Sequence, residues 1–247
     1  MKRAAMVLFA CALVHGQEIY DLLLKDGRVI DPANHRDARL DVAVIGKRIV
    51  RVASGLAVTH ARVVVDVSGF MVTPGLIDVH AHSGSKPSNT LPYGVTTVGS
   101  ACVGAECTPE NLRFRVVQEA VAQKHFPDTI SSGADILAAR ANIGTSMSIF
   151  LNLGMTAEQI IERVTLNAAR AIRRPELGTL NEGGVADIAV WEIQEGKFGF
   201  VDSAHTRLDA TRRFHCLMTV REGLIVWDSD GLSIPDTAKA GAYTNFK

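Results

Sequence analysis

Two histidines separated by one residue are the most informative feature of the sequence. His80 and His82 end an apolar run that follows the Pro-Gly turn at 74–75. Side chains alternate between faces along an extended strand, so Asp78, His80 and His82 are predicted to point to one side. Neutral imidazole is the commonest nitrogen ligand for zinc and similar divalent ions, and a carboxylate behind it can fix the tautomer of the ring. A bare His-x-His is more often two ordinary histidines, but the turn and the apolar strand favour a divalent metal site, with zinc as the expected ion.

Several segments that follow one another in order resemble the metal-dependent amidohydrolases, the superfamily of dihydroorotase, urease and related deacetylases. They are residues 74–82, 93–98, 165–172, 177–180 and 183–190. The first two resemble the first and second strands of the family's barrel, and the others resemble its exit into a closing β domain. The stretch 167–202 is most similar to the amidohydrolase/deacetylase metallohydrolases known as dihydroorotase-like. The resemblance implies a hydrolase that cleaves a C–N bond in a cyclic amide or N-acyl substrate with metal-activated water.

The length of the chain conflicts with a complete barrel. A (β/α)8 barrel takes about 250 residues and seldom fewer than about 200, whereas residues 73–181 must contain all of it here. Strands are expected at 76–80, at 95–98 and near 129–132. The missing units are placed near residues 115–118. The expected fold class is therefore α/β, with a truncated (β/α)8-barrel remnant and a composite small β-sandwich built from both chain ends.

The resemblance also implies a set of site residues. In the superfamily a lysine on strand four and single histidines on strands five and six complete the metal site, and no residue of this sequence can be assigned to those places. An aspartate on strand eight binds metal and acts as general base. Asp135 is the candidate for it, displaced from the motif position by Gly133-Ala134. Asp128 is the other candidate, but beside Pro127 it is more typical of a turn. The predicted metal ligands are thus His80, His82 and Asp135, and Asp135 is the predicted catalytic base.

The segments on either side of the barrel are rich in predicted strands. Two-residue turns at 26–27, 46–47 and 222–223 predict hairpins, because Gly and its polar neighbours tolerate positive φ. Such short strands cannot bury an apolar face alone, so the two pieces are expected to pack together. The predicted domains are a signal peptide (1–17), an amino-terminal piece of the β-sandwich (18–72), the incomplete barrel (73–181), a carboxyl-terminal piece of the β-sandwich (182–232) and a tail without structure (233–247).

A capping box at residues 156–159 predicts the start of a helix. Apolar residues follow at a spacing of four, at Ile160, Val164, Ala168 and Ile172. This stripe predicts a helix that packs against a sheet, without a catalytic role.

The amino terminus has the pattern of a secretory signal peptide. Lys2 and Arg3 precede an uncharged apolar run at 4–14, and His-Gly-Gln follows at 15–17. The run is too short for a stable membrane anchor. A start assigned too far upstream, or an apolar first strand, is the alternative. The pattern predicts a secreted or periplasmic protein.

Composition limits the partners and the redox chemistry. Lys plus Arg equal Asp plus Glu at 26 each, which gives no reason to expect a nucleic acid or an anionic membrane as partner. The expected partner is a small-molecule substrate, and a homo-oligomer is left open. Removal of the signal leaves Cys102, Cys107 and Cys216, an odd number that argues against a full disulfide framework.

Three hypotheses of function follow. The first is a metal-dependent hydrolase of C–N bonds that is impaired by its missing ligands. The second is a noncatalytic remnant that keeps the sandwich and a weak metal site as a binding or assembly module. The third is a gene model or internally deleted product that does not fold stably, because an open parallel sheet exposes unpaired edges.

Overall fold

The computed structural model describes residues 19–80, 90–98, 113–132, 142–202 and 204–236. The strands are β1 (Tyr20–Asp31), β2 (Arg36–Ile45), β3 (Arg48–Ala53), β4 (Ala61–Asp66), β5 (Met71–Pro74), β6 (Leu76–Asp78), β7 (Val95–Val98), β8 (Ile188–Val201), β9 (Arg207–Arg221) and β10 (Leu224–Asp228). The helices are α1 (Phe114–Ala122), α2 (Ile143–Asn152), α3 (Ala157–Val164) and α4 (Leu166–Ala171), with short 3-10 turns η1 (Pro32–Asn34), η2 (Val58–His60) and η4 (Leu91–Tyr93).

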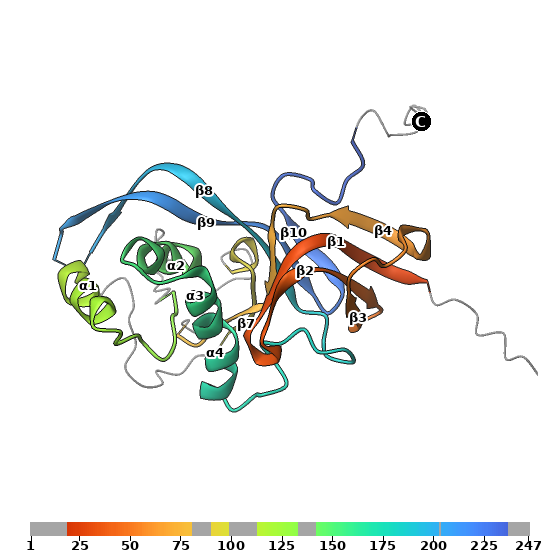
Figure 1. Cartoon of the computed structure of the whole chain (residues 1–247), viewed down its shortest axis with the longest axis horizontal. Helices are drawn as coiled ribbons and strands as arrows, with labels where there is room; N and C mark the ends of the chain where they lie inside the picture. The colour runs from red at the N-terminus through yellow and green to blue at the C-terminus, as the bar shows by residue number, and fades with distance from the viewer. Residues whose placement is uncertain (1–18, 81–89, 99–112, 133–141, 203, 237–247) are drawn as a thin grey trace, which may run out of the picture.

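Strands from both ends of the chain form one eight-stranded sheet in the order β10-β9-β8-β5-β1-β2-β3, with β4 also paired to β1. The two ends meet where β5 runs antiparallel to β8, with Met71 opposite Trp191 and Pro74 opposite Ile188. Figure 1 shows β1, β2, β3, β4 and β10 at one end of the molecule, whereas β8 and β9 extend from there over the helices. We call this sheet the β unit. Its composite origin agrees with the expectation, but its hydrogen bonding is continuous, so a sandwich of two separate sheets stays a prediction.

The predicted hairpin at Asp26-Gly27 is wrong, because β1 passes through it without turning back. Asp26 has a φ of 63°, and the register against β2 shifts between Leu24 and Gly27, which makes a bulge. The second half of β1 continues because it pairs with β5. The other two turns do form hairpins, between β2 and β3 and between β9 and β10.

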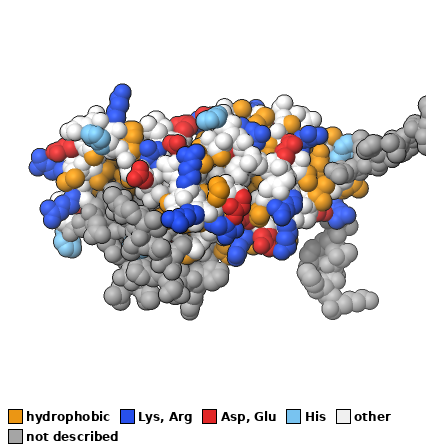
Figure 2. All heavy atoms as spheres, turned by 90° about the horizontal axis from the view of Figure 1, so that it is seen from below, with side chains coloured by type: hydrophobic (Ala, Val, Ile, Leu, Met, Phe, Trp, Pro, Cys, Tyr) orange, Lys and Arg blue, Asp and Glu red, His pale blue; other side chains and the backbone are white. Residues whose placement is uncertain are grey.

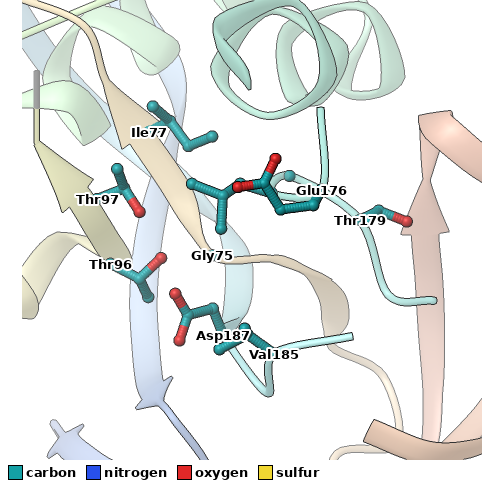
Figure 3. A pocket seen from close by; sticks show the side chains of 10 residues that line it. Gly75, Ile77, Thr96, Thr97, Glu176, Thr179, Val185 and Asp187 are labelled. Carbon is teal, nitrogen blue, oxygen red and sulfur yellow. The ribbon is translucent and has the colours of Figure 1, made fainter. Parts of the chain in front are cut away.

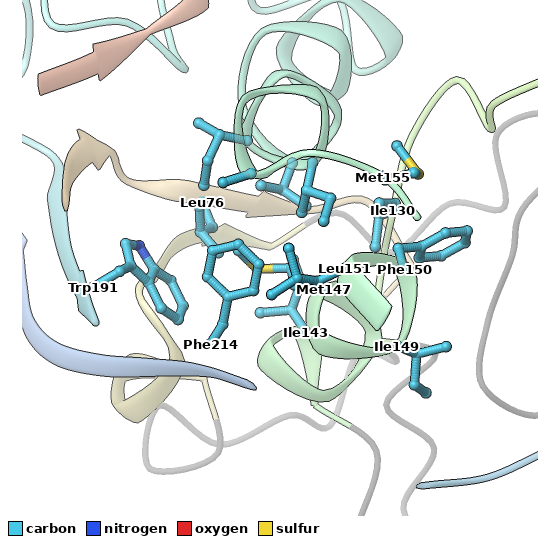
Figure 4. Close-up of a cluster of buried hydrophobic side chains, with 14 of the residues drawn as sticks. Leu76, Ile130, Ile143, Met147, Ile149, Phe150, Leu151, Met155, Trp191 and Phe214 are labelled. Atoms are coloured by element: carbon cyan, nitrogen blue, oxygen red, sulfur yellow. The ribbon is translucent and has the colours of Figure 1, made fainter. Parts of the chain in front are cut away.

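Strands β8 and β9 separate two hydrophobic cores. Ile188, Val190, Met218 and Val220 belong to the aliphatic core of the β unit. A second core, shared with α1, α2, α3, β6 and β7, contains Trp191 of β8 and Phe214 and Cys216 of β9. Trp191 has the opposite parity to Ile188 and Val190, whereas on β9 the change of core coincides with the register shift between Val190 and Trp191. Figure 4 shows Trp191 and Phe214 beside Leu76 and Met147 in this second core. Alternation along β8, together with the register shift against β9, thus lets one ribbon contribute side chains to two cores.

Strands β6 and β7 and helices α1–α4 make up what we call the barrel segment. β6 and β7 are parallel and form a two-stranded sheet of their own, as the barrel resemblance predicts for its first two strands. The strand predicted at 76–80 is shorter, since β6 ends at Asp78. Helix α1 runs across residues 115–118, where the missing units were placed.

The capping box is confirmed: the Thr156 hydroxyl accepts from Gln159 N at 3.3 Å, and the Gln159 side chain accepts from Thr156 N at 3.0 Å. The single predicted helix is instead α3 and α4, which are separated at Thr165. The Thr165 hydroxyl donates to Ile161 O at 2.6 Å. A hydrogen bond from a threonine side chain to the carbonyl four residues earlier often bends a helix. The predicted apolar stripe is still buried at Val164 and at Ile160 and Ala168.

The first residue of the predicted tail, Ser233, is hydrogen-bonded to β10. Ser233 donates from its backbone N and its hydroxyl to the Asp228 carboxylate at 2.9 and 2.6 Å, so the start of the predicted tail is held against β10. Residues 1–18 and 237–247, which include the predicted signal peptide and most of the tail, lie outside the described residues. Within the described part of the chain, no helix is both long and apolar enough to cross a bilayer.

Of the cysteines, Cys216 is buried and free, whereas Cys102 and Cys107 lie outside the described residues. Burial raises the pKa of the Cys216 thiol to about 12. This thiol therefore packs as an apolar group. The face of the molecule in Figure 2 carries basic side chains interspersed with acidic ones, in keeping with the zero net charge of the sequence.

Candidate metal centre at the end of β6

Alternation along β6 directs Asp78 away from α4. Ile77 and Val79 pack with Ala168 and Ala169 of α4, whereas Leu76 lies on the opposite side, in the core shared with β8 and β9. Asp78 has the parity of Leu76 and is buried. The carboxylate therefore lies at the carboxyl end of a parallel strand, on the interior side, which is where barrel enzymes place their catalytic groups.

The Asp78 carboxylate joins the end of β6 to a segment far along the chain. Asp78 accepts from Ser132 N at 3.1 Å and from the Ser132 hydroxyl. It also accepts from His80 N at 3.3 Å. Burial raises the pKa of Asp78, while the bonds from Ser132 and His80 and the nearby imidazole act to lower it. Asp78 was expected to orient an imidazole ring, and its hydrogen bond to His80 is instead made by the backbone.

Sequence reasoning missed Ser132. The sequence shows only two consecutive serines at 131–132, and nothing in it indicates which carboxylate they contact. Around Ser132 the third predicted strand, near 129–132, is not formed, although Ile130 makes an isolated bridge. Thr129, Ile130, Ser131 and Ser132 are all buried. The segment thus lies beside β6 through the Asp78 side chain rather than through a ladder.

The approach to this segment is fixed by two side chains from α3 and α4. Arg163 Nε donates to Pro127 O at 2.9 Å, and Asn167 Nδ2 donates to Asp128 O at 3.0 Å. Asp128 itself is exposed at a bend, which agrees with its interpretation as a turn residue. Asn167 therefore has the structural role that was expected of it.

Only some of the predicted ligands lie in the described residues. His80 is half-buried, and its Nδ1 atom is buried. His82 and Asp135 lie outside the described residues. Within the described ranges there is no group of three or more His, Cys, Asp or Glu side chains that could hold a metal ion. An imidazole and a buried carboxylate are donor types that suit a divalent ion such as zinc, but they do not complete a coordination sphere.

Among the described residues, the opposite end of β6 offers no comparable site. Figure 3 shows Gly75, Thr96 and Asp187 around a small pocket there. Its volume is about 10 Å³, which is room for one water molecule. Burial raises the pKa of Asp187, against the effect of hydrogen bonds from Glu222 N and the Thr96 side chain. This pocket is therefore too small for an organic substrate.

Comparison with known proteins gives the family. A profile described as "Amidohydrolase family" matches residues 117–223. A dihydroorotase of Streptococcus pyogenes serotype M3 is 48% identical over 61 residues, which are 25% of this chain and 14% of the relative. A dihydroorotase of Citrifermentans bemidjiense is 47% identical over 62 residues, 25% of this chain and 15% of the relative. The matched stretch is thus a small fraction of the length of these relatives.

Solved structures share the fold more widely. The crystal structure of an adenine deaminase aligns with a TM-score of 0.71 at 16% identity, over 85% of this chain and 100% of that one. A dihydroorotase structure aligns with a TM-score of 0.69 at 15% identity, over 83% of this chain and 98% of that one. At such low identity these likenesses establish a shared α/β fold. Together, the profile, the sequence relatives and the fold support a place for this chain in the metal-dependent amidohydrolase superfamily, among its dihydroorotase-like members.

Proposed function

We propose that the chain descends from a hydrolase of cyclic amide C–N bonds and keeps an impaired version of its metal centre at the end of β6. Relatives named dihydroorotase, and structural neighbours named dihydropyrimidinase and hydantoinase, support the substrate class. The position of Asp78 and His80 at the carboxyl end of a parallel strand supports the location.

The observation that carries the proposal is the link from Asp78 to Ser132. Through it, the strand end that leads to His80 and His82 lies beside the segment that leads to Asp135. Two predicted ligand-bearing stretches, distant in sequence, therefore start from neighbouring points. Asp78 acts here as a positioning residue.

In the proposed site His80, His82 and Asp135 would hold the divalent ion, with zinc as the expected one. When bound, such an ion polarises a carbonyl oxygen and makes a water molecule more acidic. Asp135 would accept a proton as the water oxygen bonds to the amide carbon. It would return that proton to the nitrogen as the C–N bond breaks, so that the proton balance closes.

Impaired activity is proposed because the sequence offers only three candidate metal ligands, His80, His82 and Asp135. A catalytic zinc keeps three protein ligands and one open position, and the three candidates leave no reserve for the second metal that the family resemblance implies. The alternative is a noncatalytic remnant with a weak metal site. It is favoured by the described barrel segment, in which only β6 and β7 pair as parallel strands.

Metal analysis of the purified chain tests the centre. We expect less than one tightly held divalent ion per chain after dialysis, and a further loss in His80→Ala and His82→Ala. His125→Ala, which removes an exposed histidine shortly after α1, is the matched control. Equal metal content in all four proteins would contradict the site.

Turnover separates the two functional hypotheses. Hydrolysis of dihydroorotate, dihydrouracil or hydantoin that is lost in His80→Ala and kept in His125→Ala would support the hydrolase. Two bound metal ions per chain together with such activity would refute the hypothesis of a noncatalytic remnant. A cooperative melt of a monomeric chain would rule out the third hypothesis, that of a product unable to fold.

Export of the chain also stays a proposal, supported by the basic residues and the apolar run at 2–14. Expression with its native start in a bacterial host would test it. The expected result is a periplasmic or secreted product whose amino terminus has lost the first 16 or 17 residues. An uncleaved product in the cell interior would contradict export.

A further inference from the structure

A second, larger cavity lies away from the proposed metal centre. It is bounded by η4, the amino-terminal turn of α2 and the ribbon of β8 and β9, and its volume is about 530 Å³. Small-molecule sites span about 300–1,000 Å³. Neither Asp78 nor His80 lines it. The cavity therefore constitutes a candidate site separate from the metal centre.

The walls of this cavity are aromatic. Tyr93, Trp191, Phe200, Phe214 and Trp227 all line it. Trp191 and Phe214 meet edge to face, with ring centroids 5.9 Å apart at 89°, an arrangement that aromatic pairs prefer. Both rings are fixed in the core that Figure 4 shows. A planar ring can stack in such an enclosure at little entropic cost.

Two indole N–H groups of the lining residues meet no acceptor within the described part of the chain. The Nε1 atoms of Trp191 and Trp227 are buried, and no hydrogen-bond partner from the described residues reaches either of them. Trp191 is 1% exposed. A buried donor without a partner is costly, and native proteins seldom leave one so. Both tryptophans that carry an unmet donor line the same cavity, which favours a ligand with acceptor atoms.

The charge around the cavity favours an anion. Arg213 and His215 line it, and its floor includes the amino-terminal turn of α2, which carries a partial positive charge. The Arg213 guanidinium lies over the Phe198 ring at 4.7 Å, and its Nε donates to Gln194 at 2.8 Å. An acidic group near the rim is Asp230, 3.9 Å from His215 Nε2.

We propose that this cavity binds a small planar aromatic carboxylate. The ring lies between the aromatic walls, and its acceptor atoms meet the indole N–H groups of Trp191 and Trp227 and the guanidinium of Arg213. The ligand needs no metal, so the site is independent of the proposed hydrolytic centre. A neutral aromatic molecule can occupy the same cavity, but it provides no negative charge to pair with Arg213.

The composition of the chain makes the test direct, because Trp191 and Trp227 are its only two tryptophans. An amide correlation spectrum of the full ¹⁵N-labelled chain therefore has two indole signals, and both report on this cavity. Titration with 2-naphthoate should move both signals saturably. The neutral 2-naphthalenemethanol should bind at least about tenfold more weakly, since it lacks the charge-assisted hydrogen bond.

Variants assign the contacts. Arg213→Gln, at an exposed position of β9, should weaken 2-naphthoate about tenfold and leave the neutral analogue unchanged. Arg207→Gln is the matched control, because Arg207 is exposed on the same strand and pairs with Asp209 at 2.9 Å. Trp227→Phe keeps an aromatic ring but removes one indole N–H. It should weaken the binding of 2-naphthoate severalfold.

Three results would overturn the proposal. Indole signals that stay in place, or that move without saturation, would show that no ligand of this class binds. Equal affinity for the carboxylate and the alcohol would show that the cavity does not select an anionic ligand. If Arg213→Gln and Arg207→Gln bind 2-naphthoate with the same affinity, Arg213 does not contact the carboxylate of the ligand.

Discussion

The β unit and the barrel segment bury their apolar faces in different ways. The β unit is a continuous eight-stranded sheet around an aliphatic core, with strands from both chain ends in register. The barrel segment has two paired strands and four helices in its described residues, and its core contains Trp191 and Phe214 from β8 and β9. As Figure 1 shows, this ribbon extends over α2. The described part of the barrel segment is thus buried in part by side chains from the neighbouring β unit.

This difference predicts where the two units depend on each other. The aliphatic core of the β unit uses residues of its own strands together with Val67, Leu180 and Ala186. The core of the barrel segment, in contrast, needs the outer face of β8 and β9. Loss of side chains on that face should therefore affect the barrel segment first.

The largest expected effect is that of Trp191→Ala. Removal of this fully buried ring should lower the free energy of unfolding by about 3–5 kcal/mol. Urea denaturation followed by far-UV circular dichroism measures it, and Leu224→Ala, at a side chain 69% exposed, should change it by less than about 0.5 kcal/mol. Two separate transitions in Trp191→Ala would sharpen the comparison, because the β unit would then outlast the barrel segment. Equal effects of the two substitutions would contradict it.

Gly27→Ala tests the bulge that lets β1 continue into the β unit. A Cβ at Gly27 would lie 2.5 Å from Val72 Cγ2 and 2.9 Å from Val67 Cγ2. Such overpacking should cost about 1–3 kcal/mol. The destabilisation by Gly27→Ala should be smaller in a Val72→Ala background, because Val72→Ala removes the nearer contact. A double-mutant cycle measures this coupling. If the two costs simply add, the two residues do not interact as the structure places them.

A smaller effect is expected in the barrel segment from loss of the α3 cap. Thr156→Ala removes the acceptor for Gln159 N and should cost about 1 kcal/mol. Thr156→Ser keeps the hydroxyl and should retain nearly all of the stability. Thermal melts of the three proteins measure the difference. A Ser variant as unstable as the Ala variant would show that the methyl group matters more than the cap.

The last prediction concerns the pH dependence of stability at Asp202, which links the ribbon to α1. Burial acts to raise the pKa of Asp202, but hydrogen bonds from Thr206, Phe114 N and Ala204 N outweigh it and lower the pKa to about 2. An unfolded aspartate titrates near about 3.9. The stabilisation is thus full above about pH 4 and is lost as the pH falls toward about 2.

Urea midpoints measured between pH 7 and pH 2 test this linkage. The protein should lose stability steadily below about pH 4, and Asp202→Asn should show a shallower fall over that window. Parallel curves for the two proteins would show that other carboxylates account for the acid sensitivity.

The sequence predicted features whose interactions span a few residues. The hairpins at 46–47 and 222–223 formed as expected because a turn depends on its own backbone angles. The capping box at 156–159 formed for the same reason. Similar local turn chemistry at Asp26-Gly27 produced a bulge, since pairing of β1 with β5 outweighed the tendency to turn.

The candidate site divides in the same way. The His-x-His spacing and the aspartate before it can be found in the sequence, because alternation along a strand is a local rule. That Ser132 would hold the Asp78 carboxylate could not be found there, since no pattern links two residues so far apart. The aromatic cavity escaped prediction too, as its walls come from η4, α2, β8, β9 and β10.

By itself, the sequence determined the superfamily, the parallel pair β6 and β7 and most of the turns, all of which depend on contiguous motifs. Only the tertiary structure decided that Met71 faces Trp191, that one ribbon divides its faces between two cores and that Asp78 is buried against Ser132. The physical reason is that a strand or a polar side chain has many local options of similar free energy. The choice among them is made by which non-local partner buries the apolar surface and satisfies the hydrogen bonds.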